Sequence, residues 1–169
     1  AVASHEVDLG FVPIENSIEG TVNFTQDALV FDHDLLIQRE VVLDIEHCLV
    51  VRPGTTLRDI KVVLSIPVAT AQCHAYLRKS LRDVDVHAAN STAEAAQMVS
   101  QDAGRNMAAI APANAAGLYG LEVLERNIAD HEGNQTRFVL VGNQQVPART
   151  GHDKTGVVVF QRADEPGSL

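Results

Sequence analysis

The sequence has few cysteines, no long apolar run and no targeting segment at its start, and each shortage excludes a class of protein. Its two cysteines, Cys48 and Cys73, cannot form the disulfide framework of a small secreted protein, and their spacing does not match a metal site. No apolar run approaches the roughly 20 residues that cross a bilayer. The first residues also lack the basic and apolar segments of a secretory signal. We therefore predict a cytoplasmic protein that does not enter the membrane.

Basic residues are also scarce. The chain has 13 Lys and Arg against 22 Asp and Glu, which gives a formal net charge of -9. This balance argues against nucleic-acid binding and against attraction to anionic lipid. With 169 residues and 46% hydrophobic content, the chain is long and apolar enough to form one ordinary domain or two small ones.

The common motifs of several enzyme classes are missing. The sequence has no G-x-x-x-x-G-K-[ST], no G-x-G-x-x-G after a strand and no G-x-S-x-G, so nucleotide binding and serine hydrolase chemistry lack their usual support. The seven histidines form no H-x-x-x-H pair and no cluster with cysteine, so we expect no metal site. His47 and Cys48 are adjacent on an alternating segment and should point to opposite faces, which favours a structural role for both.

Apolar runs of strand length alternate with segments of helical period, and this alternation predicts an α/β fold. The predicted strands are residues 10–14, 35–37, 41–51, 61–64, 84–86, 107–111, 138–141 and 155–160, the first of them buried. Pro67 marks the start of one helix, and Ser91 with Glu94 forms the capping-box pattern that starts another. Gly120 is predicted to end the helix that follows Pro112.

Polar residues follow several predicted strands directly, at Glu15-Asn16-Ser17, at Ser65 and at Asn90-Ser91-Thr92. Ligands of open α/β sheets gather at such strand ends, and helix N-termini can hold a carboxylate without a basic surface. Arg137 would add one fixed charge. These residue types are also the usual helix caps and turn formers, and Thr136 and Arg137 also suit an ordinary strand, which is the interpretation that the residues alone favour. Both interpretations nevertheless stay open.

Six segments carry a more specific signal when they are taken in order. They are Gly10–Gly20 (GFVPIENSIEG), Ser65–Cys73 (SIPVATAQC), Ser91–Ala96 (STAEAA), Ala108–Ala111 (AAIA), Tyr119–Leu121 (YGL) and Asn134–Phe138 (NQTRF). The ordered set covers most of residues 9 to 142 and resembles the prephenate dehydratase family. Its specificity lies in the combination of V-P-I-E-N-S with a later S-x-P-x-x-x-x-Q-C and N-x-T-R-F.

The resemblance implies a particular domain organisation. We expect two α/β subdomains with an intervening cleft, similar to periplasmic ligand-binding proteins. Residues 1–146 would form the catalytic domain without its usual N-terminal start, because the family's G-P-x-G-T-[FY] motif is missing. Residues 147–154 would form a linker, and residues 155–169 would begin an α+β ACT regulatory domain.

The resemblance also implies a reaction in L-phenylalanine biosynthesis. Family members convert prephenate to phenylpyruvate, carbon dioxide and water, as carbon–oxygen lyases that need no cofactor. The implied partners are prephenate, phenylalanine as an allosteric effector of the full-length protein, and further copies of the chain in a homodimer or homotetramer. Two alternatives stay open: an arogenate dehydratase, and a non-catalytic protein of the same fold that binds aromatic acids.

Site residues follow from the same resemblance, position by position. Thr136 is similar to the family's essential hydroxyl, which would assist the departing hydroxide, while the amides of Asn16 and Gln72 would hold the substrate and its developing charge. The expected substrate-binding residues are Glu15, Ser65, Ser91, Thr92 and Arg137, with bracing of the loop as the alternative role of Arg137. Ile66 departs from the family, which commonly has His there, and an apolar side chain can neither titrate nor donate.

Overall fold

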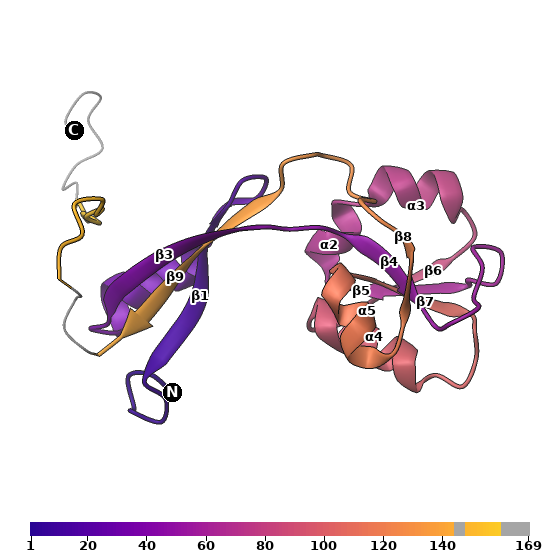
Figure 1. Ribbon diagram of the computed structural model, residues 1–169. Helices are drawn as coiled ribbons and strands as arrows, with labels where there is room; N and C mark the ends of the chain where they lie inside the picture. Colours follow the sequence, from indigo (N-terminus) through magenta and orange to yellow (C-terminus); the bar gives the residue numbers. More distant parts are fainter. Residues whose placement is uncertain (144–147, 160–169) are drawn as a thin grey trace. The chain divides into compact units, whose positions relative to one another are not determined.

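A computed structural model describes residues 1–143 and 148–159 of the chain. The chain divides into two compact units (Figure 1). Residues Ala1–Leu43 and Thr136–Leu169 form the first, which we call the terminal unit, and Asp44–Gln135 form the second, the central unit. Each unit contains its own β-sheet. The division confirms the predicted α/β fold with two subdomains.

The central unit has a five-stranded sheet with the strand order β6-β5-β7-β4-β8. Its strands are β4 (Cys48–Val51), β5 (Val62–Ser65), β6 (Asp85–Ala88), β7 (Met107–Ala111) and β8 (Glu122–Glu125). β5 runs parallel to β6 and β7, whereas β4 is antiparallel to β7 and β8. All four residues of β4 are buried, as expected of a strand that is covered on both faces.

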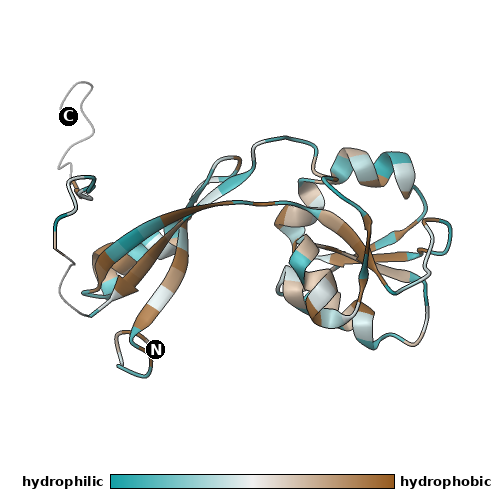
Figure 2. Ribbon diagram, in the orientation of Figure 1, coloured by the Kyte–Doolittle hydropathy of each residue, from teal (hydrophilic) through white to brown (hydrophobic). Residues whose placement is uncertain are grey.

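Helices cover both faces of this sheet (Figure 1). One face carries α2 (Pro67–Ala71) and α3 (His74–Ser80), and the other carries α4 (Thr92–Gln101) and α5 (Ala113–Tyr119). Alternation along β4 sends Cys48 and Val50 into the core under α4 and α5, while Leu49 and Val51 enter the core under α2 and α3. Figure 2 shows the apolar strands of the sheet between helices of more mixed polarity.

The terminal unit has a four-stranded sheet with the order β2-β1-β9-β3. Its strands are β1 (Leu9–Asn16), β2 (Gly20–Thr21), β3 (Leu36–Asp44) and β9 (Gln135–Gly142), and a short helix α1 (Asn23–Asp27) continues into a π-helical turn η1 (Ala28–Asp32). The prediction of a buried strand at residues 10–14 was wrong about burial. Phe11 stacks on Phe138 of β9 with ring centroids 4.7 Å apart. Phe11 is nevertheless 48% exposed, so the neighbouring strand covers its ring only in part.

Several boundaries differ from the sequence-based prediction. Residues 36–44 form one continuous strand, because the polar residues Gln38 and Glu40 occupy alternating positions and do not interrupt it. β8 was not predicted, since a four-residue edge strand with Glu at both ends has a weak pattern. The structure assigns no strand to residues 155–159 of the predicted ACT segment. The rest of that segment, residues 160–169, lies outside the described part of the chain, and so do residues 144–147 at the predicted domain boundary.

Candidate active site

Thr136 and Asn16 form a hydrogen-bonded pair in the terminal unit. They are direct partners in the antiparallel register of β9 and β1, and Asn16 Nδ2 donates to Thr136 Oγ1 over 2.9 Å. The amide oxygen of Asn16 accepts from the backbone N–H groups of Ile18 and Glu19 at 2.9 and 3.0 Å, in the loop to β2. This local turn fixes the orientation of the Asn16 amide, so its nitrogen faces the Thr136 hydroxyl.

The direction of this hydrogen bond decides what Thr136 can do. Because Asn16 donates, the Thr136 oxygen acts as the acceptor, and the hydroxyl hydrogen is directed elsewhere. Thr136 is only 8% exposed, so the bond lies in an environment that is poor in water. A hydroxyl that accepts one hydrogen bond becomes a better donor in the next. The pair therefore presents a polarised O–H donor.

Glu15 and Arg137 form a second pair directly beside the first. They are register partners on β1 and β9, with Arg137 Nη1 3.2 Å from Glu15 Oε2 and Arg137 Nε 3.9 Å from Glu40 Oε2. Successive residues of a strand point to opposite faces, so this ion pair lies on the sheet face opposite Thr136 and Asn16. Both side chains are about half exposed. Arg137 thus lies within ion-pair distance of carboxylates on β1 and β3.

Gln72 lies in the central unit, at the break between α2 and α3. Its side-chain oxygen accepts from His47 Nε2 at 2.8 Å and from Asn134 Nδ2 at 3.0 Å, and its backbone oxygen accepts from the N–H of Asp130 at 2.7 Å. Gln72, His47 and Asn134 are 7%, 6% and 6% exposed. Buried polar groups are stable only when they are hydrogen-bonded, so these bonds hold Gln72 firmly in place.

Two members of this cluster were not assigned to the site from the sequence. His47 was given a structural role, and Asn134 was part of the N-x-T-R-F motif without a role of its own. One signal was available for Asn134, since a polar residue that belongs to a motif and lies beside a strand has to be hydrogen-bonded if it is buried. No sequence pattern joins His47 to Gln72, because their contact depends on how β4 packs beside α2.

Ser65, Ser91 and Thr92 lie at the carboxyl ends of the neighbouring parallel strands β5 and β6, as predicted. Ser65 ends β5, is fully buried and donates its hydroxyl to the backbone oxygen of Ile110 at 2.7 Å. Ser91 is the N-cap of α4 and accepts from the backbone N–H of Glu94 at 2.9 Å. Thr92 is the first residue of α4. The backbone N–H of Ala89 donates to the backbone oxygen of Ser65 at 2.9 Å, and this bond joins the ends of β5 and β6.

Ile66 directly precedes α2 and has an extended backbone conformation. Its side chain packs partly buried against the core under α2 and α3. At this position the chain therefore offers an apolar packing residue and no hydrogen-bonding group.

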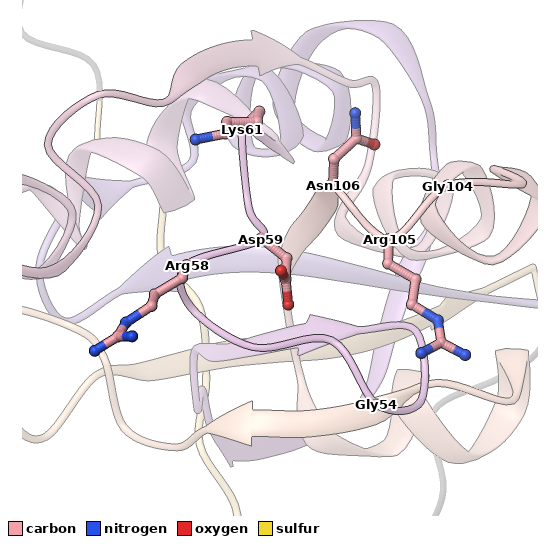
Figure 3. A pocket seen from close by; sticks show the side chains of 7 residues that line it. All are labelled: Gly54, Arg58, Asp59, Lys61, Gly104, Arg105 and Asn106. Carbon is pink, nitrogen blue, oxygen red and sulfur yellow. The ribbon is translucent and has the colours of Figure 1, made fainter.

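A surface hollow of the central unit contains none of the predicted site residues. It is lined by Gly54, Arg58, Asp59, Lys61, Gly104, Arg105 and Asn106 (Figure 3). Lys61 and Asn106 immediately precede β5 and β7, so the hollow lies at the amino ends of these strands, opposite Ser65. Figure 3 shows the side chains of Arg58 and Arg105 pointing apart, so their charges do not converge on one ligand position.

Within residues 1–143 and 148–159, no group of three or more His, Cys, Asp or Glu side chains could hold a metal ion. In the same part of the chain, no helix combines the length and the apolar character that a membrane span requires.

Comparison with known proteins decides the family. The family model described as prephenate dehydratase matches residues 1–146. The chain belongs to the prephenate dehydratase family. A prephenate dehydratase from Mycolicibacterium vanbaalenii is 44% identical over 170 residues, an alignment that covers 100% of this chain and 54% of the relative. The chain spans about half the length of the curated prephenate dehydratases that it matches.

Solved structures agree with this assignment. A prephenate dehydratase from Arthrobacter aurescens, crystallised in complex with L-Phe, has a TM-score of 0.78 and 39% identity, over 89% of this chain and 50% of that one. GqqA, described as a novel type of quorum quenching acylase, has a TM-score of 0.73 and 34% identity, over 88% of this chain and 53% of that one. The prephenate dehydratase from Arthrobacter aurescens thus shares the fold of this chain.

Proposed function

We propose that this chain forms the greater part of the catalytic region of a prephenate dehydratase. The reaction is the conversion of prephenate to phenylpyruvate, carbon dioxide and water, which makes the enzyme a carbon–oxygen lyase. The observation that carries the proposal is the Thr136–Asn16 hydrogen bond, in a chain that belongs to this family. It supplies a polarised hydroxyl, which is the group that loss of a ring hydroxide requires.

The chemistry explains why one donor is enough. In prephenate, the bond between the ring and its carboxylate breaks, and the electron pair moves through the ring to expel the hydroxyl group on the opposite carbon. Carbon dioxide leaves, the ring becomes aromatic, and the departing hydroxide takes up one proton to become water. Aromatisation supplies the driving force, so the enzyme has to stabilise the leaving oxygen. Thr136 donates to that oxygen, and such assistance is worth about 10²–10⁴-fold in rate.

The remaining predicted residues receive roles by their chemistry. Gln72 holds the substrate through its side-chain amide. Ser91 and Thr92, with the first N–H groups of α4, offer donors to a carboxylate of the substrate. Ser65 shapes the carboxyl end of β5. Glu15 and Arg137 remain predicted binding residues, and their mutual ion pair favours a supporting role.

We further propose that residues 155–169 begin an ACT regulatory domain and that phenylalanine regulates the longer protein. The structure of a relative in complex with L-Phe supports a phenylalanine-binding function within the family. The cytoplasmic location and the homodimeric or homotetrameric state stay predictions. Phenylalanine added to the longest form of the protein is expected to lower its turnover, and equal rates with and without phenylalanine would contradict this regulation.

The test is the appearance of phenylpyruvate, followed by its absorbance in alkali, when prephenate is mixed with the longest form of the protein. Thr136→Ala is expected to lower kcat by roughly 10²–10⁴-fold, because the donor to the leaving oxygen is lost. Thr136→Ser keeps the hydroxyl and should keep measurable turnover. Thr21→Ala, at an exposed threonine on β2 of the same sheet, is the matched control and should behave like the parent.

Each outcome has a defined meaning. Turnover that depends on Thr136 and tolerates Thr21→Ala supports both the reaction and its donor. A Thr136→Ala variant with near-normal turnover removes Thr136 from the mechanism. If the folded parent leaves prephenate unchanged but converts arogenate, the enzyme is an arogenate dehydratase. If neither compound reacts and both bind, the chain is a binding protein of this fold.

A further inference from the structure

We infer that His47 is a positioning residue that holds the side-chain amide of Gln72 in one orientation, with its carbonyl oxygen turned to the buried cluster and its nitrogen turned away from it. The inference rests on the proposed function, in which Gln72 contacts the substrate. It assigns a role to a histidine that the site motifs do not include.

The hydrogen-bond directions follow from the chemistry of the three groups. The carbonyl oxygen of Gln72 can only accept, so His47 has to donate from Nε2 and Asn134 from Nδ2. A neutral imidazole that carries its proton on Nε2 has a lone pair on Nδ1. His47 Nδ1 is buried and has no hydrogen-bond partner among residues 1–143 and 148–159. The ring is therefore held by a single side-chain bond, the one to Gln72.

This arrangement resists rotation of the Gln72 amide. If the amide turned over, its NH₂ group would face the NH₂ group of Asn134 and the ring of His47. His47 could accept from it only by moving its proton to Nδ1. That would bury an N–H without a partner, which costs more than an unpaired lone pair. Both neighbours thus favour the observed orientation.

The backbone holds the two partners at hydrogen-bonding distance. The N–H of Ile128 donates to the backbone oxygen of His47 at 3.0 Å, and the N–H of Asp130 donates to the backbone oxygen of Gln72 at 2.7 Å. The carboxylate of Asp130 also accepts from the N–H of Ala75 at 3.0 Å, at the start of α3. Residues 128–130 therefore hold the backbone in place both at His47 and at the break between α2 and α3. The rotation of the Gln72 side-chain amide is then determined by neighbouring side chains.

The functional consequence is a fixed donor. A primary amide presents either an acceptor or a donor to a ligand, and the observed orientation presents the donor side away from His47 and Asn134. A carboxylate-bearing substrate needs that donor. Loss of His47 would let the amide populate the reversed orientation, which places a carbonyl oxygen against an anion. Misplacement of a catalytic contact costs on the order of 10²-fold in rate.

The kinetic test compares two substitutions of His47 in the longest form of the protein. His47→Leu removes the donor and is expected to lower kcat by roughly 10–100-fold. His47→Gln carries an amide nitrogen at the reach of Nε2 and should recover most of that loss. In a Gln72→Leu background, His47→Leu should cause little further loss, because the two residues act through one another. His74→Leu, at the exposed start of α3, is the matched control.

A spectroscopic measurement separates this inference from the proposed function, because it needs no substrate. Long-range ¹H–¹⁵N spectra of the parent should show His47 protonated at Nε2 and unprotonated at Nδ1. The side-chain NH₂ group of Gln72 should give one set of signals in the parent, which His47→Leu shifts or splits. If the parent turns over neither prephenate nor arogenate, the proposed function has failed, and these spectra still decide the orientation.

Three results would overturn the inference. The first is a His47→Leu variant that folds and keeps kcat within about threefold of the parent. The second is a His47 ring protonated at Nδ1 in the parent. The third is a His47→Gln variant that loses as much activity as His47→Leu while its circular dichroism matches the parent. If His47→Leu fails to fold, the parent spectra and the His47→Gln kinetics still test the assignment.

Discussion

Burial changes the chemistry of the two cysteines at the residue scale. Cys48 and Cys73 are both fully buried. Burial, with a smaller contribution from the nearby Asp130 carboxylate, raises the pKa of Cys73 to about 12. Burial and a hydrogen bond with Glu46 also raise the pKa of Cys48. The thiolate is the reactive form, so neither thiol is suited to nucleophilic chemistry, which agrees with the structural role expected for Cys48.

The raised pKa of Cys73 predicts a loss of stability in alkali. Between the ordinary thiol pKa of 9.0 and the native value of about 12, the unfolded chain loses the proton while the native chain keeps it. The free energy of unfolding therefore falls as pH rises through this window, by at most about 1.4 kcal/mol per pH unit for this thiol. Urea unfolding of the parent and of Cys73→Ala at several pH values should show a shallower decline for the variant.

A matched control separates titration from packing in this experiment. Val63→Ala creates a cavity in the same core cluster as Cys73 but removes no titrating group. It should lower stability by a similar amount at every pH and leave the slope unchanged. Equal slopes for the parent, Cys73→Ala and Val63→Ala would show that the Cys73 thiol does not contribute to the alkaline transition.

At the scale of single elements, the helix ends follow local sequence chemistry. Ser91 caps α4 through the N–H of Glu94, and Pro67 occupies the first turn of α2, where its missing N–H costs no hydrogen bond. Gly120 ends α5 in the left-handed region with φ of 65°. These three signals were read correctly because the residues that cause them lie within a few positions of the helix end.

Gly117 within α5 and Gly120 at its end are predicted to respond to alanine in opposite ways. Gly117 lies inside the helix, and a Cβ there would meet no atom within 4 Å, so Gly117→Ala should stabilise the protein by about 0.5–1 kcal/mol. Gly120 has the same open surroundings but a positive φ, so Gly120→Ala should destabilise it by about 1–2 kcal/mol. Chemical denaturation of both variants measures the difference, and shifts of the same sign would contradict the argument.

The two units differ in how much apolar surface they bury, at the scale of the whole molecule. Within the described part of the chain, the buried hydrophobic residues of the terminal unit are Val139 and Val141, and all others belong to the central unit. The terminal unit instead leaves large apolar side chains such as Phe24 and Phe31 well exposed. Since apolar burial is the main source of stability, most of the folding free energy belongs to the central unit.

This contrast predicts unequal local stability. We expect slower exchange of amide hydrogens in the central sheet, at β4, β5 and β7, than in β1 and β9, by at least about tenfold. Opening β1 and β9 to solvent breaks fewer buried apolar contacts. Hydrogen–deuterium exchange followed by mass spectrometry on the whole chain measures both sets together. Equal protection in the two sheets would show that the terminal unit is stabilised by contacts beyond its buried apolar residues.

The predicted site residues differ in how closely the structure brings them together. Motif resemblance singled out Thr136, Asn16 and Gln72, and the structure places the first two in direct contact. The motifs did not reveal that Glu15 and Arg137 form an ion pair on the opposite face of the sheet. They also did not reveal that the Ser65 hydroxyl donates to the backbone of Ile110 in β7. The side on which a strand residue lies depends on register, and the bulge between Pro13 and Glu15 shifts that register.

Local chemistry in the sequence determined the alternation of strands and helices, the ends of α4 and α5, and the family to which the chain belongs, because those signals act over a few residues or reside in motifs. Tertiary structure alone decided that Asn16 meets Thr136 and that His47 meets Gln72, since these partners are far apart in the chain. It also decided that β1 is only partly covered, because burial depends on what packs against a strand, and the pattern of its own residues does not specify that.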